Sequence, residues 1–539
     1  MKLGVSYYPE HNPEEQWHTD LMSIRDAGIE RVRVAEFAWS RLEPDNGRFE
    51  WGWLDRFLDL AGEYGLGVIL CTPTASPPIW LVEQYPEVLP VDDEGRRNVF
   101  GARQHRCYNS PAYRSHGLRI VEEMAVRYGN HPNVVAWQLD NEFGGEQKRC
   151  YCDHCKLAFQ SELEARFSNI VELNARWGNV FWSMEYQRFS QIATPMKYKT
   201  DLWLKNNPSL EMAYTRFCSD AIVRFSCEQI AHIRPHSGVR PITTNRFPLE
   251  WGDNVDWFEL VRELDVAGMD LYSEKLHEIA FYADFNASLK PGNSWFMEYG
   301  PNSANLADGM RQLQGRGVEW FTVFKFKPFP FGQEQSLKEL VTTTGEPTDS
   351  YRLMQAWAGE ERSGDLPPRF ASSGIGLVFS FESSWAYTIS IWGAQINHRM
   401  HYPNYVVDVV YHALFDERLS HRIVGPGESL DGLHTVVVPL HIVHDPELEA
   451  RLRSFAEGGG TVVVTSDLFQ KNKDNVFLGA MPEIYTEWFG LCSFLSSPKP
   501  EGDPVLYRVT VGDRGGKVVM LHKDATLEDW QEVLVGLNG

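Results

Sequence analysis

The 539-residue chain is poor in cysteine and in basic residues. Its eight cysteines are too sparse for the disulfide framework that holds small secreted domains together. Lysine and arginine number 51 against 73 aspartates and glutamates, and the formal charge of −22 argues against nucleic acid or an anionic membrane surface as a partner. No run approaches the ~20 consecutive apolar residues of a membrane span. These absences leave a globular protein that binds neither nucleic acid nor membrane.

A targeting signal is also missing from the sequence. The first ten residues, MKLGVSYYPE, carry one lysine and a short apolar stretch, without the small-residue cleavage site of a secretory leader. We therefore expect a cytoplasmic protein, in which thiols stay reduced.

Short β-rich runs alternate with helical patterns over the first 330 residues. Apolar residues recur at helical spacing in 14–28, 53–65 and 112–129, and Gly marks the end of each. Such alternation implies a parallel sheet, and eight units over this length favour a (β/α)8 TIM barrel. A doubly wound open sheet is the alternative, but no Gly-rich dinucleotide turn follows the first strand. The predicted strands are 2–8, 31–39, 67–74, 134–142, 241–247, 265–273, 294–300 and 320–326.

The pattern changes after the barrel. Residues 360–369, EERSGDLPPR, are charged and Pro-rich and predict a linker. We expect a catalytic barrel over 1–360, a smaller α/β domain over 370–490, and a short C-terminal β-rich segment over 491–539 that contains a hairpin.

Four acidic residues follow predicted barrel strands: Glu36, Asp140, Glu142 and Glu298. Catalytic groups of such barrels lie at the C-terminal ends of the strands. Glu142 and Glu298 end the fourth and seventh strands, which face each other across the barrel mouth. Two facing carboxyl groups, one protonated and one ionised, are what glycosidic cleavage requires. The alternative for each is a helix cap or an ion pair with arginine.

Three cysteines stand within six residues of the segment CYCDHC. Cys150, Cys152 and Cys155 have the spacing of ligands in a structural zinc site, which takes four tetrahedral ligands. Cys107 is the predicted fourth ligand because its loop leaves the same barrel face; His154 is a rival, and a disulfide is the alternative. Such a site is fully coordinated, so its expected role is to brace the loop that follows Glu142.

Six segments together resemble glycoside hydrolase family 42, the β-galactosidases of clan A: VVAWQLDNEF, RVRVAEFAWSRLEPDNGRFEW, TPTASPPIWL, RQHRCYNSPAYR, NVFWSMEY and CYCDHC. The resemblance implies a retaining mechanism in which Glu142 is the acid/base and Glu298 the nucleophile. It also implies that the second domain is a trimerisation domain and that the four cysteines bind Zn²⁺. The substrate-binding residues that it implies are Asn141 (for the sugar 2-hydroxyl), Arg103, Tyr272, Glu334 and Trp182, the last reaching a neighbouring subunit's active site. For Arg103 and Tyr272, an ordinary ion pair and a half-buried tyrosine are the alternatives.

The segment FKFKPFPFGQEQSL departs from the family motif F-R-W-R…Q-E-x-x-H. Glu334 matches, whereas Leu337 stands at the histidine position, Phe326 at the tryptophan position, and Lys325 and Lys327 replace arginines. Leucine cannot bond a hydroxyl, so galactose selectivity should weaken. The expected function is that of an exo-acting β-glycosidase that hydrolyses small oligosaccharides or glycosides, with β-D-galactosides first. The alternatives are a glucoside, mannoside, fucoside or arabinopyranoside as substrate, or a non-catalytic sugar-binding barrel.

Overall fold

The computed structural model describes residues 1–146, 148–197, 206–301, 304–389, 401–494 and 504–538. The chain forms two compact units. The first combines residues 1–154 with 218–370, and the second combines 155–217 with 371–539.

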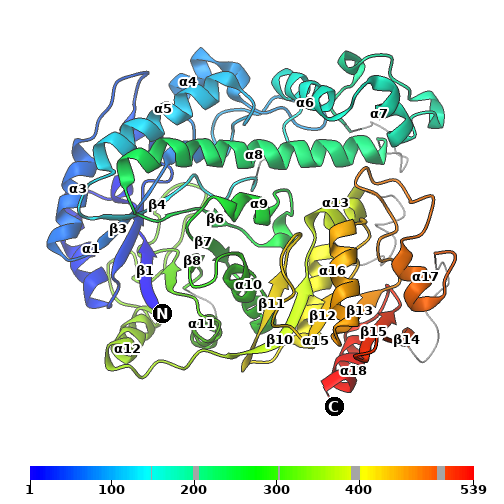
Figure 1. Ribbon diagram of the computed structural model, residues 1–539. Coiled ribbons are helices and arrows are strands. Elements are labelled where there is room, and N and C mark those ends of the chain that lie inside the picture. Colours follow the sequence, from blue (N-terminus) through cyan, green and yellow to red (C-terminus); the bar gives the residue numbers. More distant parts are fainter. Residues whose placement is uncertain (147, 198–205, 302–303, 390–400, 495–503, 539) are drawn as a thin grey trace. The chain divides into compact units, whose positions relative to one another are not determined.

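The first unit is built on a closed sheet of parallel strands, coloured blue to green in Figure 1. The strand order is β5-β4-β3-β2-β1-β9-β8-β7-β6. Residue Thr244 alone separates β5 from β6; β5 pairs with β4 and β6 pairs with β7, so this split strand closes the sheet. The result is the predicted (β/α)8 barrel. Its strands are β1 (Lys2–Ser6), β2 (Arg31–Val34), β3 (Gly67–Cys71), β4 (Val134–Gln138), β5 (Ile242–Thr243), β6 (Asn245–Arg246), β7 (Ala267–Leu271), β8 (Ser294–Tyr299) and β9 (Trp320–Val323).

Helices lie outside these strands (Figure 1). In α3, Trp53, Leu54, Phe57, Leu58 and Ala61 are buried, which is the spacing of one helix face. The helices of this unit are α1 (Glu14–Asp26), α2 (Trp39–Leu42), α3 (Gly52–Glu63), α4 (Ile79–Gln84), α5 (Pro111–Tyr128), α9 (Trp257–Arg262), α10 (Leu276–Leu289), α11 (Leu306–Gly315) and α12 (Asp349–Ser363). The long helix α8 (Pro208–Ser237) leads back into the barrel.

The first part of the predicted linker over 360–369 is helical. Helix α12 continues to Ser363 because Tyr351, Met354 and Trp357 bury one face of it, and it ends where Gly364 takes a left-handed conformation with φ 81°. The charged residues at 360–362 therefore form the exposed last turn of a helix.

The second unit contains a six-stranded sheet in the order β11-β10-β12-β13-β15-β14. The C-terminal hairpin forms, with β14 antiparallel to β15, and β15 pairs with β13, so the hairpin is an edge of this sheet. The strands are β10 (Ala371–Val378), β11 (Leu419–Val424), β12 (Thr435–Val438), β13 (Thr461–Thr465), β14 (Val505–Val511) and β15 (Gly516–Leu521). The remaining α-helices are α6 (Asp153–Arg166), α7 (Ile170–Trp177), α13 (Phe381–Ile389), α14 (Tyr402–Tyr405), α15 (His412–Leu414), α16 (Pro446–Glu457), α17 (Glu483–Phe489) and α18 (Leu527–Asn538), with a π-helical turn over Val406–Tyr411.

The core of the second unit lies between this sheet and its helices. It joins Val436 and Val462 from the strands to Leu452 from α16 and Trp488 from α17. Among the helices of the described residues, none is both long and apolar enough to cross a membrane.

Candidate active site and metal centre

The two predicted carboxyl groups meet at the C-terminal end of the barrel. Glu298 lies within β8, and Glu142 follows β4 by four residues. Both side chains are buried, and one oxygen of each lies within 4.8 Å of the other and of an oxygen of Asp270 on β7. The fold thus brings Glu142 and Glu298 together across the barrel.

The segment that carries Glu142 has an unusual backbone. Asp140 and Glu142 have φ of 51° and 47°, in the left-handed region that non-glycine residues rarely occupy. Buried side chains hold this conformation: the amide of Gln104 donates to the carbonyl oxygens of residues 141 and 142 at 3.0 and 2.9 Å, and Thr72 accepts from the backbone N–H of Asp140 at 2.7 Å. Such strain persists only where the surroundings fix it, and it aims the Glu142 side chain.

Glu298 is held by donors on both oxygens. Nη1 of Arg33 donates to its Oε1 at 2.7 Å, and the hydroxyl of Tyr272 donates to Oε2. Arg33 is fully buried on β2, and its Nη2 donates to Asn141 at 2.8 Å. A positive charge and a hydroxyl donor both stabilise the ionised form of the Glu298 carboxyl group.

Glu142 has a different environment. Burial and the nearby charge of Glu298 raise the pKa of Glu142 to about 7, although Arg103 opposes this shift with Nη2 at 3.0 Å from Oε2. The amide of Asn141 donates to the same oxygen at 3.2 Å. Glu142 is therefore suited to carry a proton near neutral pH, while Glu298 faces a guanidinium and a hydroxyl donor.

Three residues of the site were missed from the sequence: Arg33, Asn245 and Asp270. Asn245 on β6 contacts Asn141, Glu298 and Asp270 through its side-chain amide. A signal was present, since Arg33 and Asp270 are charged residues inside apolar strand segments, RVRV and AGMDL, where a buried charge needs a partner.

The other two acidic candidates have structural partners. Glu36 accepts from the hydroxyl of Tyr8 and lies 3.3 Å from Arg33. Asp140 pairs with the buried Arg106 at 2.6 Å and accepts from Thr74 at 2.6 Å. Both are fully buried, so the ion-pair alternative holds for them.

Glu334 lies near Arg103 in a cavity of about 340 Å³, with Oε1 4.0 Å from the guanidinium. The described lining of this cavity is rich in aromatic rings and includes His11, Phe329 and Phe331. Tyr8, Phe37, Ser76, Gly101, Ala102, Gly332 and Gln333 complete it.

Phe326 and Leu337 are absent from the described lining of that cavity. Phe326 is 1 % exposed and packs edge-on against Tyr7 in the core, whereas Leu337 is 82 % exposed. The lysines also face other groups: Nζ of Lys325 lies 3.6 Å from Glu339, and that of Lys327 bonds Gln16 at 2.8 Å. Phe326 and Leu337, which stand at the family's tryptophan and histidine positions, therefore lie away from that cavity, and Phe329 and Phe331 line it in their place.

Trp182 lies in the second unit. It is 66 % exposed, packs against Phe181 with ring centroids 4.7 Å apart, and has a left-handed φ of 54°. Val180 and Phe181 are also exposed, so Trp182 belongs to a contiguous apolar patch, and such patches mark interaction sites.

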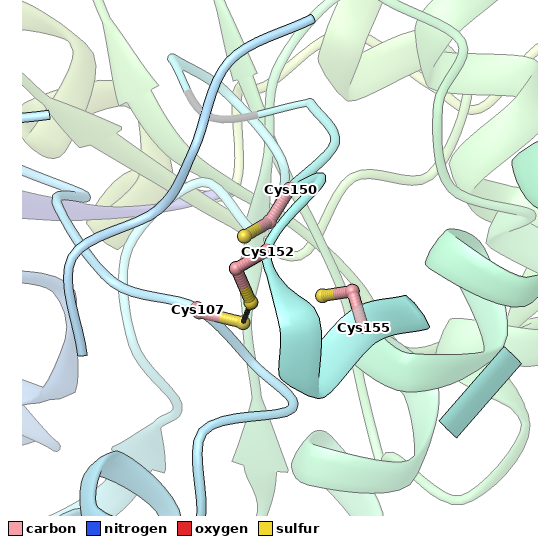
Figure 2. Close-up of side chains that lie close together, drawn as sticks. All are labelled: Cys107, Cys150, Cys152 and Cys155. Carbon is pink, nitrogen blue, oxygen red and sulfur yellow. Dashed lines mark hydrogen bonds between the residues drawn. The ribbon is translucent and has the colours of Figure 1, made fainter. Parts of the chain in front are cut away.

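The four predicted cysteines form one cluster. The sulfurs of Cys107, Cys150, Cys152 and Cys155 turn toward one another in Figure 2, and all lie within 4.8 Å. Those of Cys107 and Cys152 are 3.6 Å apart, close to the ~3.8 Å edge of a tetrahedron with ~2.3 Å metal–sulfur bonds. His154 is outside this group, and none of the chain's eight cysteines, all in described segments, forms a disulfide.

The donor set of this cluster fits a metal ion. All four thiols are buried, and the backbone N–H of Val91 donates to the sulfur of Cys150 at 3.4 Å, as expected for a thiolate. The cluster ties the loop of Cys107 to the segment that follows Glu142. The described residues thus contain a closed four-sulfur site that could hold a metal.

Comparisons with known proteins agree with this arrangement. Residues 6–362 match the family model described as beta-galactosidase, and residues 373–534 match the model described as beta-galactosidase trimerisation domain. A beta-galactosidase of Thermus thermophilus is 37 % identical over 495 residues, which cover 86 % of this chain and 74 % of the relative.

Solved structures are similar along nearly the whole chain. The beta-galactosidase of the psychrophilic Marinomonas ef1 has a TM-score of 0.89 and 28 % identity, covering 100 % of this chain and 91 % of that one. The enzyme of the haloarchaeon Halorubrum lacusprofundi gives 0.88 and 28 %, with 99 % and 89 % covered. With a family model matching two-thirds of its length, the chain belongs to the beta-galactosidase family of glycoside hydrolases, family 42.

Proposed function

We propose that this glycoside hydrolase is a retaining, exo-acting β-glycosidase that hydrolyses β-D-galactosides. The observation that carries the proposal is the facing pair Glu142 and Glu298, with oxygens within 4.8 Å. An approach of the two nearest oxygens to within 4.8 Å suits the ~5–5.5 Å carboxyl separation of retaining enzymes better than the ~6.5–9.5 Å of inverting ones. The names of the relatives support galactosides.

The roles follow from the surroundings of each carboxyl group. Glu298, oriented by hydrogen bonds from Arg33 and Tyr272, attacks the anomeric carbon and forms a glycosyl-enzyme bond. Glu142 gives its proton to the leaving oxygen and then removes a proton from the water that releases the sugar. We assign Asn141 to the sugar 2-hydroxyl, and Arg103 and Glu334 to hydroxyls farther around the ring.

The direct test is the configuration of the first product. Proton NMR of the hydrolysis of an aryl β-galactoside should show the β-anomer of the sugar before mutarotation produces the α-anomer. First release of the α-anomer would contradict the assignment of Glu298 as nucleophile.

The pH profile provides a second prediction. Because Glu142 must be protonated to act as acid, kcat/KM should be high below its pKa of about 7 and fall about tenfold per pH unit above it. Glu142→Gln should remove this alkaline limb along with most of the activity toward substrates with poor leaving groups. A limb that stays at the same pH in the residual activity of Glu142→Gln would assign it to another group.

Sugar selectivity provides a third prediction. The cavity beside Glu334 presents the rings of Phe329 and Phe331, and the family histidine is replaced by the exposed Leu337. A site with fewer hydroxyl partners discriminates less, by ~1–3 kcal/mol per lost contact. Across 4-nitrophenyl β-galactoside, glucoside, mannoside, fucoside and α-L-arabinopyranoside, at least one other sugar should match or exceed galactose in kcat/KM. Exclusive β-galactosidase activity would show that another group replaces the lost contact.

We also propose Zn²⁺ as the metal of the four-cysteine cluster. Cys107, Cys150, Cys152 and Cys155 supply the all-thiolate tetrahedral set that zinc prefers in closed sites. With four protein ligands, zinc there braces the segment behind Glu142 and leaves the chemistry to the carboxyl groups.

The assembly and location that best suit this enzyme are a trimer and the cytoplasm. The match of residues 373–534 to a trimerisation domain supports the trimer, and the exposed Trp182 is the residue we assign to a neighbouring subunit's active site. Sedimentation at two concentrations tests the trimer. Trp182→Ala should raise KM while the sedimenting mass stays nearly unchanged.

A further inference from the structure

The side-chain amide of Asn245 contacts the backbone of Glu142 and the carboxyl group of Glu298. Its Nδ2 lies 2.8 Å from Asn141 Oδ1 and 3.3 Å from Glu298 Oε1. Its Oδ1 accepts from the backbone N–H of Glu142 at 3.1 Å and from Gln138 at 2.9 Å. The side chain is fully buried, and Asn245 donates to one more acceptor, which is described below.

Only one orientation of this amide satisfies its neighbours. Turning it by 180° would place Oδ1 against the oxygens of Asn141 and Glu298, and Nδ2 against two N–H donors. Because buried donors and acceptors without partners are costly, the orientation controls both the Glu142 backbone and the Glu298 carboxylate.

Asp270 is the strongest contact of the Asn245 amide, accepting at Oδ2 from Nδ2 at 2.6 Å. It is fully buried on β7, and its Oδ1 is buried without a hydrogen-bond partner. Burying a charged oxygen without a hydrogen-bond partner costs far more free energy than burying a neutral hydroxyl. Its Oδ2 accepts, so a proton on Asp270 would sit on Oδ1.

Two other carboxyl groups lie close to Asp270. Glu142 and Glu298 each have an oxygen within 4.8 Å of it, and Arg33, one of the cations near the cluster, bonds Glu298. Burial and these two carboxyl groups raise the pKa of Asp270 well above its usual range, against the opposing effect of Arg33. The other ionisable groups that face it are Arg246 and Tyr272.

We propose that Asp270 is a positioning residue: as a neutral carboxylic acid it fixes the orientation of the Asn245 amide and, through that amide, the placement of Glu142 and Glu298. This inference rests on the proposed roles of those two residues. It adds a third carboxyl group that holds the other two in place without touching the substrate.

The experiment compares Asp270→Leu with Asp270→Asn on an aryl β-glycoside. Leucine removes the acceptor, so kcat should fall about 100-fold with KM changed by less than about threefold. Asparagine keeps a neutral acceptor for Asn245, so kcat of Asp270→Asn should be at least about tenfold higher than that of Asp270→Leu. Asp349→Leu, at an exposed position on α12, is the matched control and should behave as the wild type.

The pH profile tests whether Asp270 is neutral. If Asp270 is neutral, Asp270→Asn should move the alkaline limb by less than half a pH unit. If it is ionised, removing its charge should lower the pKa of Glu142 and move the limb down by about one unit or more, which would overturn the proposal. Activity of Asp270→Leu within tenfold of wild type would overturn it as well.

Two further measurements keep the outcome clear. Should Asp270→Leu fail to fold, Asn245→Ala takes its place and should show the same loss of kcat at constant KM. If the wild type hydrolyses none of the tested β-glycosides, the proposed function itself fails. If it does hydrolyse them, and the Glu298 variant does not, a fully active Asn245→Ala refutes the positioning role alone.

Discussion

Glu298→Ala should lower kcat/KM for an aryl β-galactoside by about 10⁴-fold or more, because it removes the atom that forms the covalent bond to the sugar. The fold should survive, since Arg33 keeps its bonds to Gln138 and Asn141 at 2.7 and 2.8 Å. Thermal unfolding checks the fold, and initial rates check the activity. Glu83→Ala, at an exposed position on α4, is the matched control and should retain wild-type rates.

Azide distinguishes the two carboxyl groups. In Glu142→Ala the nucleophile remains, so azide should react with the glycosyl-enzyme formed from an activated substrate, raise the rate and give the β-glycosyl azide. In Glu298→Ala any azide product should have the α configuration, because azide then attacks in place of the missing carboxylate. A β-azide from Glu298→Ala would mean that another residue is the nucleophile.

Removal of the metal should have the largest effect on stability. Cys152→Ser takes one sulfur from the four-cysteine cluster, and we expect a Tm lower by roughly 5–15 °C, at about 2–4 °C per kcal/mol. The rate per folded molecule should change less than about threefold, because the site has no open position for a substrate. Differential scanning calorimetry and active-site titration give these two numbers.

Metal analysis completes the experiment. The wild type should contain one zinc per chain and Cys152→Ser none, while Cys492→Ser, at an exposed thiol outside the cluster, should match the wild type in metal and Tm. A disulfide among the four cysteines together with an absence of zinc would end the assignment.

The sequence by itself determined the barrel, the positions of Glu142 and Glu298, and the cysteine group. Each of these depends on local patterns that survive in the fold: period-two and period-3.6 burial define strands and helices, and parallel strands place their C-terminal ends at one face. Cys150, Cys152 and Cys155 are close in sequence, so their sulfurs can meet without a distant segment of the chain.

Only the tertiary structure decided which residues surround the carboxyl groups. Arg33 meets Glu298 across 265 positions of the chain, and Asn245 meets Asn141 across 104; contacts of this kind depend on strand register and not on any local pattern. The segment after β9 has no regular strand or helix, so no period in the sequence predicts which way its side chains turn. The sequence offers four phenylalanines there, and the fold buries Phe326 while it turns Phe329 and Phe331 to the cavity beside Glu334.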